Sequence, residues 1–203
     1  MKTLFLLLLF VAALPLPKPV NNHLKLSPPQ ADSGLIKLEN KKALIDQYIT
    51  KHSKTLIVFV KVPGKKDLAM VKNDKWPDEI EYTVNILKNS SGKIIFIAQM
   101  LDSESGDWSI IYKHYFDEQG NTYAFSKAEF FFDDNIKSGA VHLRVLNYYD
   151  TGFNVINKIN QLTDGNDKVL KGDKNLYNQF HNDYSIYKNL SDCLVGYNIK
   201  LAN

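Results

Sequence analysis

The chain has 203 residues, of which 44% are hydrophobic, 23% are charged and 12% are aromatic. This composition is that of one ordinary globular domain and excludes a disordered, a collagen-like or a membrane-spanning protein. The single cysteine, Cys193, excludes a disulfide framework and a cysteine-ligated zinc cluster, because both need several sulfurs. The formal net charge of +3 is too small to predict nucleic acid or an anionic membrane as a partner.

The N-terminus has the three parts of a secretory signal peptide. Lys2 is a basic start, Leu4 to Ala12 is an apolar run, and Ala13 ends a small-residue cleavage pattern. The run is too short to cross a bilayer comfortably, which takes about 20 apolar residues. We therefore expect a signal peptide at residues 1–13 and a secreted or periplasmic mature chain without a membrane span. An uncleaved anchor is the alternative.

The mature chain divides into a leader and one domain. Residues 14–34 are rich in proline and polar residues, which predicts a flexible leader. Residues 35–203 form a single globular α+β domain. Apolar residues at helical spacing predict an amphipathic helix from Leu38 to His52. Asp183 is a candidate N-cap for a second helix from Tyr184 to Val195.

Between these helices the apolar period changes to two and β-branched and aromatic residues become frequent, which predicts strands. Turns at Gly92, Gly120 and Gly152 predict antiparallel hairpins, because glycine can take the positive φ of a short loop. Their spacing of about 30 residues fits a recurring hairpin geometry or, as the alternative, a tandem repeat. The predicted strands are Thr55–Val62, Glu79–Leu87, Lys93–Gln99, Trp108–Phe116, Thr122–Phe132, Val141–Tyr149 and Phe153–Leu162.

These elements together predict an α+β fold. We expect an antiparallel β-meander of about seven to eight strands, with an N-terminal and a C-terminal helix packed on the apolar face of the sheet. A β-sandwich or a half-barrel is the alternative.

Local sequence motifs for catalysis are absent: there is no GxSxG, HExxH, GxGxxG or phosphate-binding loop. The acidic loop from Asp102 to Asp107 lacks the spacing of a calcium loop, and with Asp133 and Asp164 it predicts ordinary turns. Cys193 lies among apolar residues, which predicts a packed, unreactive thiol. We therefore expect no catalytic residues, no cofactor and no metal site.

A secreted hydrolase or a metal-dependent enzyme is the alternative function, because such sites are defined by geometry and can be assembled from dispersed residues. The candidates are His114, His142, Glu129 and Asp107. This alternative requires that the two histidines meet near a carboxylate in one cleft.

The leading hypothesis is an exported, non-catalytic binding or interaction module. Alternate side chains of a strand point to opposite faces, so the aromatic middle strands place rings on both faces. A binding surface for a peptide, a glycan or an envelope protein is expected from exposed rings beside cations. Its predicted members are Tyr115, Tyr123, Phe125, Lys113, Lys127 and Arg144. The alternative is that both faces are covered, by the helices and by other strands or a second subunit.

Overall fold

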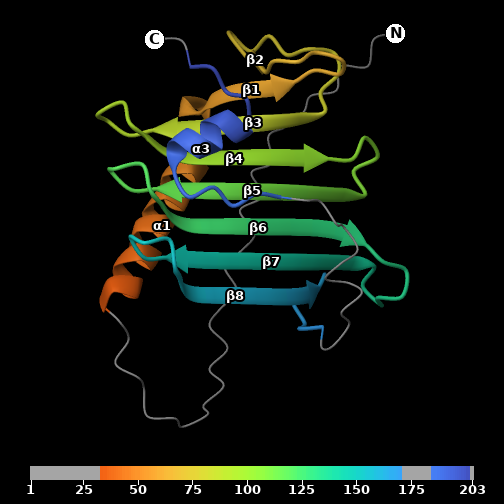
Figure 1. Cartoon of the computed structure of the whole chain (residues 1–203). Coiled ribbons are helices and arrows are strands. Elements are labelled where there is room, and N and C mark those ends of the chain that lie inside the picture. The colour runs from red at the N-terminus through yellow and green to blue at the C-terminus, as the bar shows by residue number, and fades with distance from the viewer. Residues whose placement is uncertain (1–32, 171–183, 202–203) are drawn as a thin grey trace.

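The computed structural model describes residues 33–170 and 184–201. In this part of the chain, eight strands form one antiparallel sheet in the order β2-β1-β3-β4-β5-β6-β7-β8. The helices are α1 (Ser33–Lys51), the short 3₁₀ helix η1 (Ser53–Thr55) and α3 (Leu190–Gly196). The strands are β1 (Ile57–Lys61), β2 (Ala69–Met70), β3 (Tyr82–Lys88), β4 (Ile94–Asp102), β5 (Trp108–Phe116), β6 (Thr122–Phe132), β7 (Ala140–Tyr149) and β8 (Val155–Asp164). In Figure 1, α1 lies behind the sheet and α3 lies in front of it.

The predicted antiparallel meander is confirmed. From β3 to β8, each strand pairs with the strand that follows it in the sequence. The strands lie in one sheet, whereas the alternative β-sandwich needs two. The sequence analysis missed β2, which pairs only Ala69 and Met70 with β1. Two residues are too few to show the alternation by which strands are recognised.

Four turns share one geometry. Asn89, Asp117, Asp150 and Asp164 each begin a turn, and each side-chain oxygen accepts hydrogen bonds from the backbone amides two and four residues later. The residue three positions later has positive φ. Gly92 (φ 78°) and Gly120 (φ 83°) take this position as predicted. In the Asp150 turn, Phe153 (φ 67°) takes the position instead of Gly152, which corrects that prediction.

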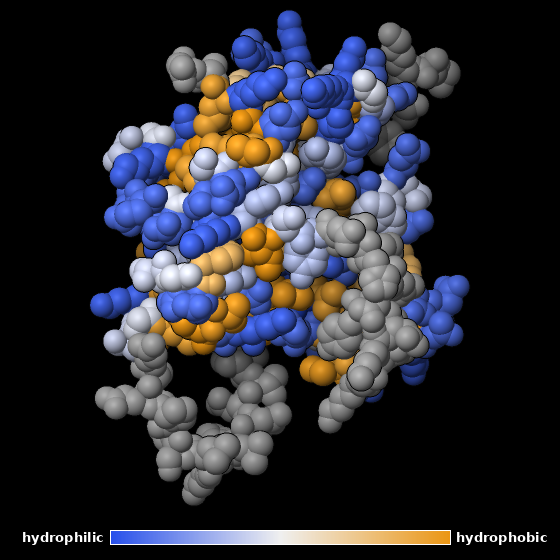
Figure 2. All heavy atoms as spheres, viewed as in Figure 1, coloured by the Kyte–Doolittle hydropathy of each residue, from blue (hydrophilic) through white to orange (hydrophobic). Residues whose placement is uncertain are grey.

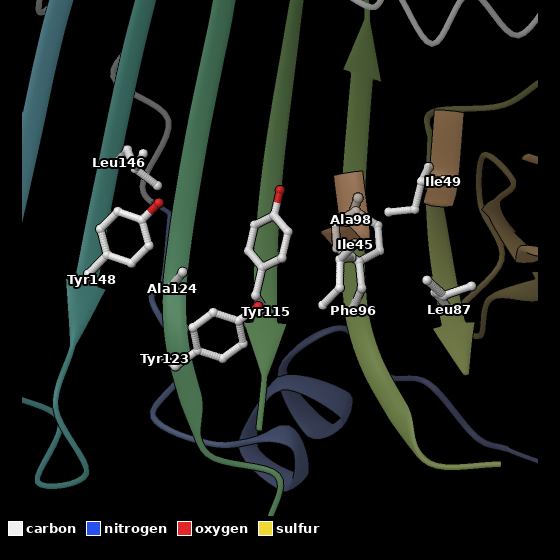
Figure 3. Close-up of a cluster of buried hydrophobic side chains, with 10 residues drawn as sticks. All are labelled: Ile45, Ile49, Leu87, Phe96, Ala98, Tyr115, Tyr123, Ala124, Leu146 and Tyr148. Atoms are coloured by element: carbon white, nitrogen blue, oxygen red, sulfur yellow. The ribbon is translucent and has the colours of Figure 1, made fainter. Parts of the chain in front are cut away.

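The face of the sheet that contacts α1, here called the α1 face, carries Phe96, Tyr115 and Tyr148. Ile45 and Ile49 of α1 join these residues in one buried cluster. Figure 3 shows the rings of Phe96, Tyr115, Tyr123 and Tyr148 on neighbouring strands, with Ile45 of α1 in front of Phe96. The Tyr115 hydroxyl donates to Asp46 Oδ1 at 2.7 Å, and Lys42 Nζ lies 2.6 Å from Asp46 Oδ2. These polar contacts fix the helix on the sheet.

The opposite face, here called the α3 face, has a core of its own. Cys193, Tyr197 and Ile199 pack there against Ile97 and Phe116. The prediction placed both helices on one face of the sheet. This is wrong, because alternate strand residues point to opposite faces, and one set contacts α1 while the other set contacts α3. Figure 2, which views the α3 side, shows hydrophobic side chains in several places separated by hydrophilic ones.

The predicted C-terminal helix is shorter than expected. It begins at Leu190, and Asn189 is its N-cap, accepting a hydrogen bond from the Asp192 amide. The residues before it are irregular because their carbonyl groups bind the sheet: Thr122 donates to the carbonyl oxygens of Tyr187 and Lys188.

Several predictions lie outside the described residues. They are the signal peptide at residues 1–13, the leader up to residue 32 and the proposed N-cap Asp183. The predicted leader ended at residue 34, whereas α1 already begins at Ser33. Neither described α-helix is long and apolar enough to cross a membrane.

Candidate functional site

The predicted surface residues lie on both faces of the sheet. Lys113, Tyr115 and Arg144 lie on the α1 face together with Tyr123, which packs into the cluster below α1. In contrast, Phe125 and Lys127 lie on the α3 face, where they pair with His114 and Tyr112 of β5. One binding surface therefore cannot contain all of these residues.

The expectation that the rings of Tyr115, Tyr123 and Phe125 point outward is wrong. Tyr115 and Phe125 are 0% exposed and Tyr123 is 4% exposed. Different elements cover these rings: α1 covers Tyr115 and Tyr123, and Tyr184 stacks on Phe125 with ring centroids 5.6 Å apart. Lys127 is also buried. Only Lys113, which is half-buried, and Arg144, which is exposed, reach the surface.

Lys127 is buried because it forms an ion pair with Glu129, two residues further along the same face of β6. The Lys127 ammonium also lies 4.8 Å from the centroid of the Tyr184 ring. Burial raises the pKa of Glu129, and Lys127 opposes that rise. A buried charged side chain that pairs with an opposite charge of the same protein needs no counter-charge from a ligand. We therefore assign this pair to the packing of the α3 face.

The histidines of the alternative enzyme site do not meet. His114 lies on the α3 face, where its Nε2 accepts from the Tyr187 amide at 3.3 Å. Burial lowers the pKa of His114 to about 3. His142 lies on the α1 face, paired with Phe130. Glu129 is held by Lys127 on the α3 face, and Asp107 lies exposed in the turn after β4.

Other reactive groups also give no site. Among the described residues, no three His, Cys, Asp or Glu side chains form a group that could hold a metal ion. Cys193 is 0% exposed, and burial raises the pKa of its thiol, which disfavours the nucleophilic thiolate.

Part of the α1 face lies beyond the cluster beneath α1. The register places α1-face residues of neighbouring strands side by side in rows. The row under the helix contains Phe96, Tyr115, Ala124 and Tyr148. The next row contains Lys113, Ser126, Ile159 and Leu146, of which Leu146 still belongs to the cluster beneath α1. The rows after it contain Met100, Ile111, Ala128 and Arg144, then Asp102, Phe130 and His142, and finally Phe132. Met100, Ile111, Phe130, Phe132 and Ile159 belong to none of the hydrophobic clusters of the described residues. We call the rows from Lys113 to Phe132 the open half of the α1 face.

The open half is partly apolar and accessible. Phe132 is 55% exposed and Ile159 is 39% exposed. Phe130 packs edge-on against Phe132, with ring centroids 5.0 Å apart, and its ring also contacts His142. Small side chains, Ser126 and Ala128, occupy the middle strand. The register places Arg144 and His142 in the rows between Ile159 and Phe132. Accessible aromatic and aliphatic side chains together with Met and Arg are typical of an interaction surface.

Two cations belong to this open half. Lys113 of β5 and Arg144 of β7 lie on either side of β6, and neither side chain makes a hydrogen bond or an ion pair with a described residue. Burial lowers the pKa of Lys113 most; Asp46 opposes this effect, and nearby Lys42 and Arg144 add to it. The sequence analysis identified both cations. It missed Ile111, Phe130 and Phe132, whose alternate spacing along the strands was the available signal.

Comparison with known proteins adds no relative: no protein-family model, no curated protein and no solved structure matches this chain.

Proposed function

We propose that this protein is an exported, non-catalytic interaction module that binds a partner through the open half of its α1 face. The observation that carries the proposal is that the open half exposes Phe132 and Ile159 and also contains Lys113 and Arg144, which have no ion-pair partner among the described residues. A sheet face that only needed solubility would carry polar residues at these alternate positions. The partner is a peptide, a glycan or an envelope protein.

The proposed export rests on the N-terminal sequence pattern. Lys2, the apolar run from Leu4 to Ala12 and the small residues up to Ala13 fit a cleaved signal peptide. Expression of the full chain in a bacterial host, followed by N-terminal sequencing of the exported material, is expected to show a mature chain that begins at Leu14. Retention in the cytosol with the first residues intact would contradict export.

The binding proposal is tested with the mature chain, a random peptide library and an array of defined oligosaccharides. Molecules selected by the wild-type chain are expected to lose binding to the double variant Phe132→Ser/Ile159→Asn. Both substituted side chains are exposed, so the fold should be retained. The matched control is Val155→Ser, which removes a similarly exposed apolar side chain (53%) at the start of β8, outside the open half. Unchanged binding by the double variant would contradict the proposal.

A further inference from the structure

We propose that the open half of the α1 face binds an acidic peptide segment of a protein partner, with carboxylates of the segment bound by Lys113 and Arg144. This inference rests on the proposed function and names the class of ligand that the same surface would take.

First, the basic residues on and next to the sheet differ in whether a carboxylate pairs with them. Lys42 has Asp46 as its partner on the α1 face, and Lys127 has Glu129 on the α3 face. Lys113 and Arg144 have no carboxylate partner among the described residues. A cation that is partly removed from water is stabilised by a hydrogen-bonded anion. The half-buried Lys113 therefore has an unmet demand for an anionic group.

The second step is that the nearest acid cannot meet this demand. One oxygen of Asp46 accepts from the Tyr115 hydroxyl and the other pairs with Lys42. Burial raises the pKa of the Tyr148 hydroxyl most; Glu39 of α1 lies near Tyr148 and raises this pKa further, whereas Arg144 lowers it. His142 of β7 and Asp102 of β4 lie in the row of Phe130, two rows away from Lys113. The described side chains that act electrostatically on Lys113 are thus Lys42, Asp46 and Arg144, which are two basic residues and one acidic residue.

The third step is the arrangement of the two cations. Lys113 pairs with Ser126 across β5 and β6, and Arg144 pairs with Ala128 across β7 and β6. The cations therefore flank the two small residues of the middle strand from opposite sides. Figure 3 shows the preceding α1-face residue of that strand, Ala124, as a short side chain between Tyr115 and Tyr148. No large β6 side chain separates the cations, so one extended segment lying over β6 could contact both.

The last step concerns the rest of the ligand. The surroundings are mainly aliphatic, from Met100, Ile111 and Ile159, and the two phenylalanines Phe130 and Phe132 pack edge-on against each other. Aliphatic side chains complement the apolar side chains of a peptide, whereas sugars are held by flat ring faces. In an extended peptide, side chains two residues apart point the same way, so acidic residues can alternate with residues that face elsewhere. The surroundings therefore favour a peptide over an acidic glycan.

The test begins with peptides selected from a random library on the immobilised mature chain. The selected peptides are expected to be enriched in Asp and Glu, and a synthetic copy in which these are replaced by Asn and Gln should bind about tenfold more weakly or worse, the size of one charge-assisted contact. The double variant Lys113→Gln/Arg144→Gln should bind both copies equally weakly. The matched control, Lys158→Gln on the exposed part of β8, should behave as the wild type. Because Lys113 is half-buried, the single variant Arg144→Gln at an exposed position repeats the test without risk to the fold.

The outcomes separate this inference from the proposed function. If peptides bind and need Phe132 and Ile159 but lose nothing on neutralisation, the acidic preference is wrong and the interaction surface stands. If oligosaccharides that contain uronic acids bind in a manner that needs Lys113 and Arg144, and peptides do not bind, the peptide assignment is overturned. If nothing binds to the open half, both proposals are overturned.

Discussion

At the residue scale, His114 is a titratable group that is removed from water. It is 0% exposed, and the rings of Phe125, Tyr187 and Tyr197 surround it. Its Nε2 accepts a backbone hydrogen bond, so the folded state requires the neutral ring. The pKa of His114 is lowered from 6.5 to about 3 by burial.

The lowered pKa of His114 predicts a loss of stability in acid. Between about pH 6.5 and about pH 3 the unfolded state binds a proton that the folded state does not, so the free energy of unfolding falls with decreasing pH, by up to about 3 to 5 kcal/mol over that window. Above that window the contribution is fully present. Urea titrations at several pH values should show a shallower pH dependence for His114→Phe than for the wild type. Identical curves for His114→Phe and the wild type would contradict the burial of a neutral His114.

The buried tyrosines give a second prediction at this scale. Tyr115→Ala and Tyr123→Ala should each lower the free energy of unfolding by about 3 to 5 kcal/mol, because each deletes a large buried ring. Tyr115→Phe removes only the hydroxyl that donates to Asp46 and should cost about 1 to 2 kcal/mol. Tyr48→Phe, which changes a tyrosine that is 44% exposed on α1, is the control. Urea melts decide the matter: a small effect of Tyr115→Ala would mean that the ring faces solvent.

At the element scale, the hairpins depend on their first residue. Asp117 Oδ1 accepts hydrogen bonds from the Gln119 and Asn121 amides in the turn between β5 and β6. Asp117→Ala leaves both amides without this acceptor and should destabilise the protein by about 1 to 2 kcal/mol. Glu118→Ala in the same turn removes an exposed ion pair with Lys93 and an exposed hydrogen bond from Asn89 Nδ2 at 3.5 Å, and should change little. Equal thermal midpoints for the two variants would show that the Asp117 side chain does not hold the turn.

The elements also show which parts of the fold sequence can predict. The bounds of β5 and β6 were predicted as observed, because period-two patterns and a capped turn are local signals. The extent of the C-terminal helix was not, because Thr122, far away in the chain, binds the carbonyl groups of Tyr187 and Lys188. The position of Phe153 at positive φ follows from Asp150 at the start of its turn, and stacking on Tyr149 accompanies it. The presence of Gly152, one residue earlier, led to the wrong prediction that Gly152 has the positive φ.

At the scale of the whole molecule, the candidate site depends on which faces are covered. Strand periodicity places Tyr115 and Trp108 on opposite faces, but it does not say that α1 and the segment from Tyr184 to Leu201 cover one face each. Whether an aromatic strand residue is exposed therefore depends on segments that are distant in the sequence. This is why Lys113 and Arg144 were identified as surface cations, while the accompanying rings were misplaced.

The C-terminal segment that covers the α3 face contains the only cysteine of the chain, which makes the closure of that face measurable. Cys193 is 0% exposed in contact with the sheet, and burial raises the pKa of its thiol. A thiol reagent should therefore modify Cys193 only when the segment opens, and the rate should rise with urea concentration.

The same helix offers a matched control for this last prediction. Val195 is 78% exposed, so the variant Cys193→Ala/Val195→Cys should react at the rate of an unprotected cysteine under the same native conditions. The wild-type thiol should react far more slowly, and both proteins should react alike in strong urea. Rapid modification of wild-type Cys193 without denaturant would mean that the segment does not close the α3 face, and that the molecule has a second uncovered sheet face besides the open half of the α1 face.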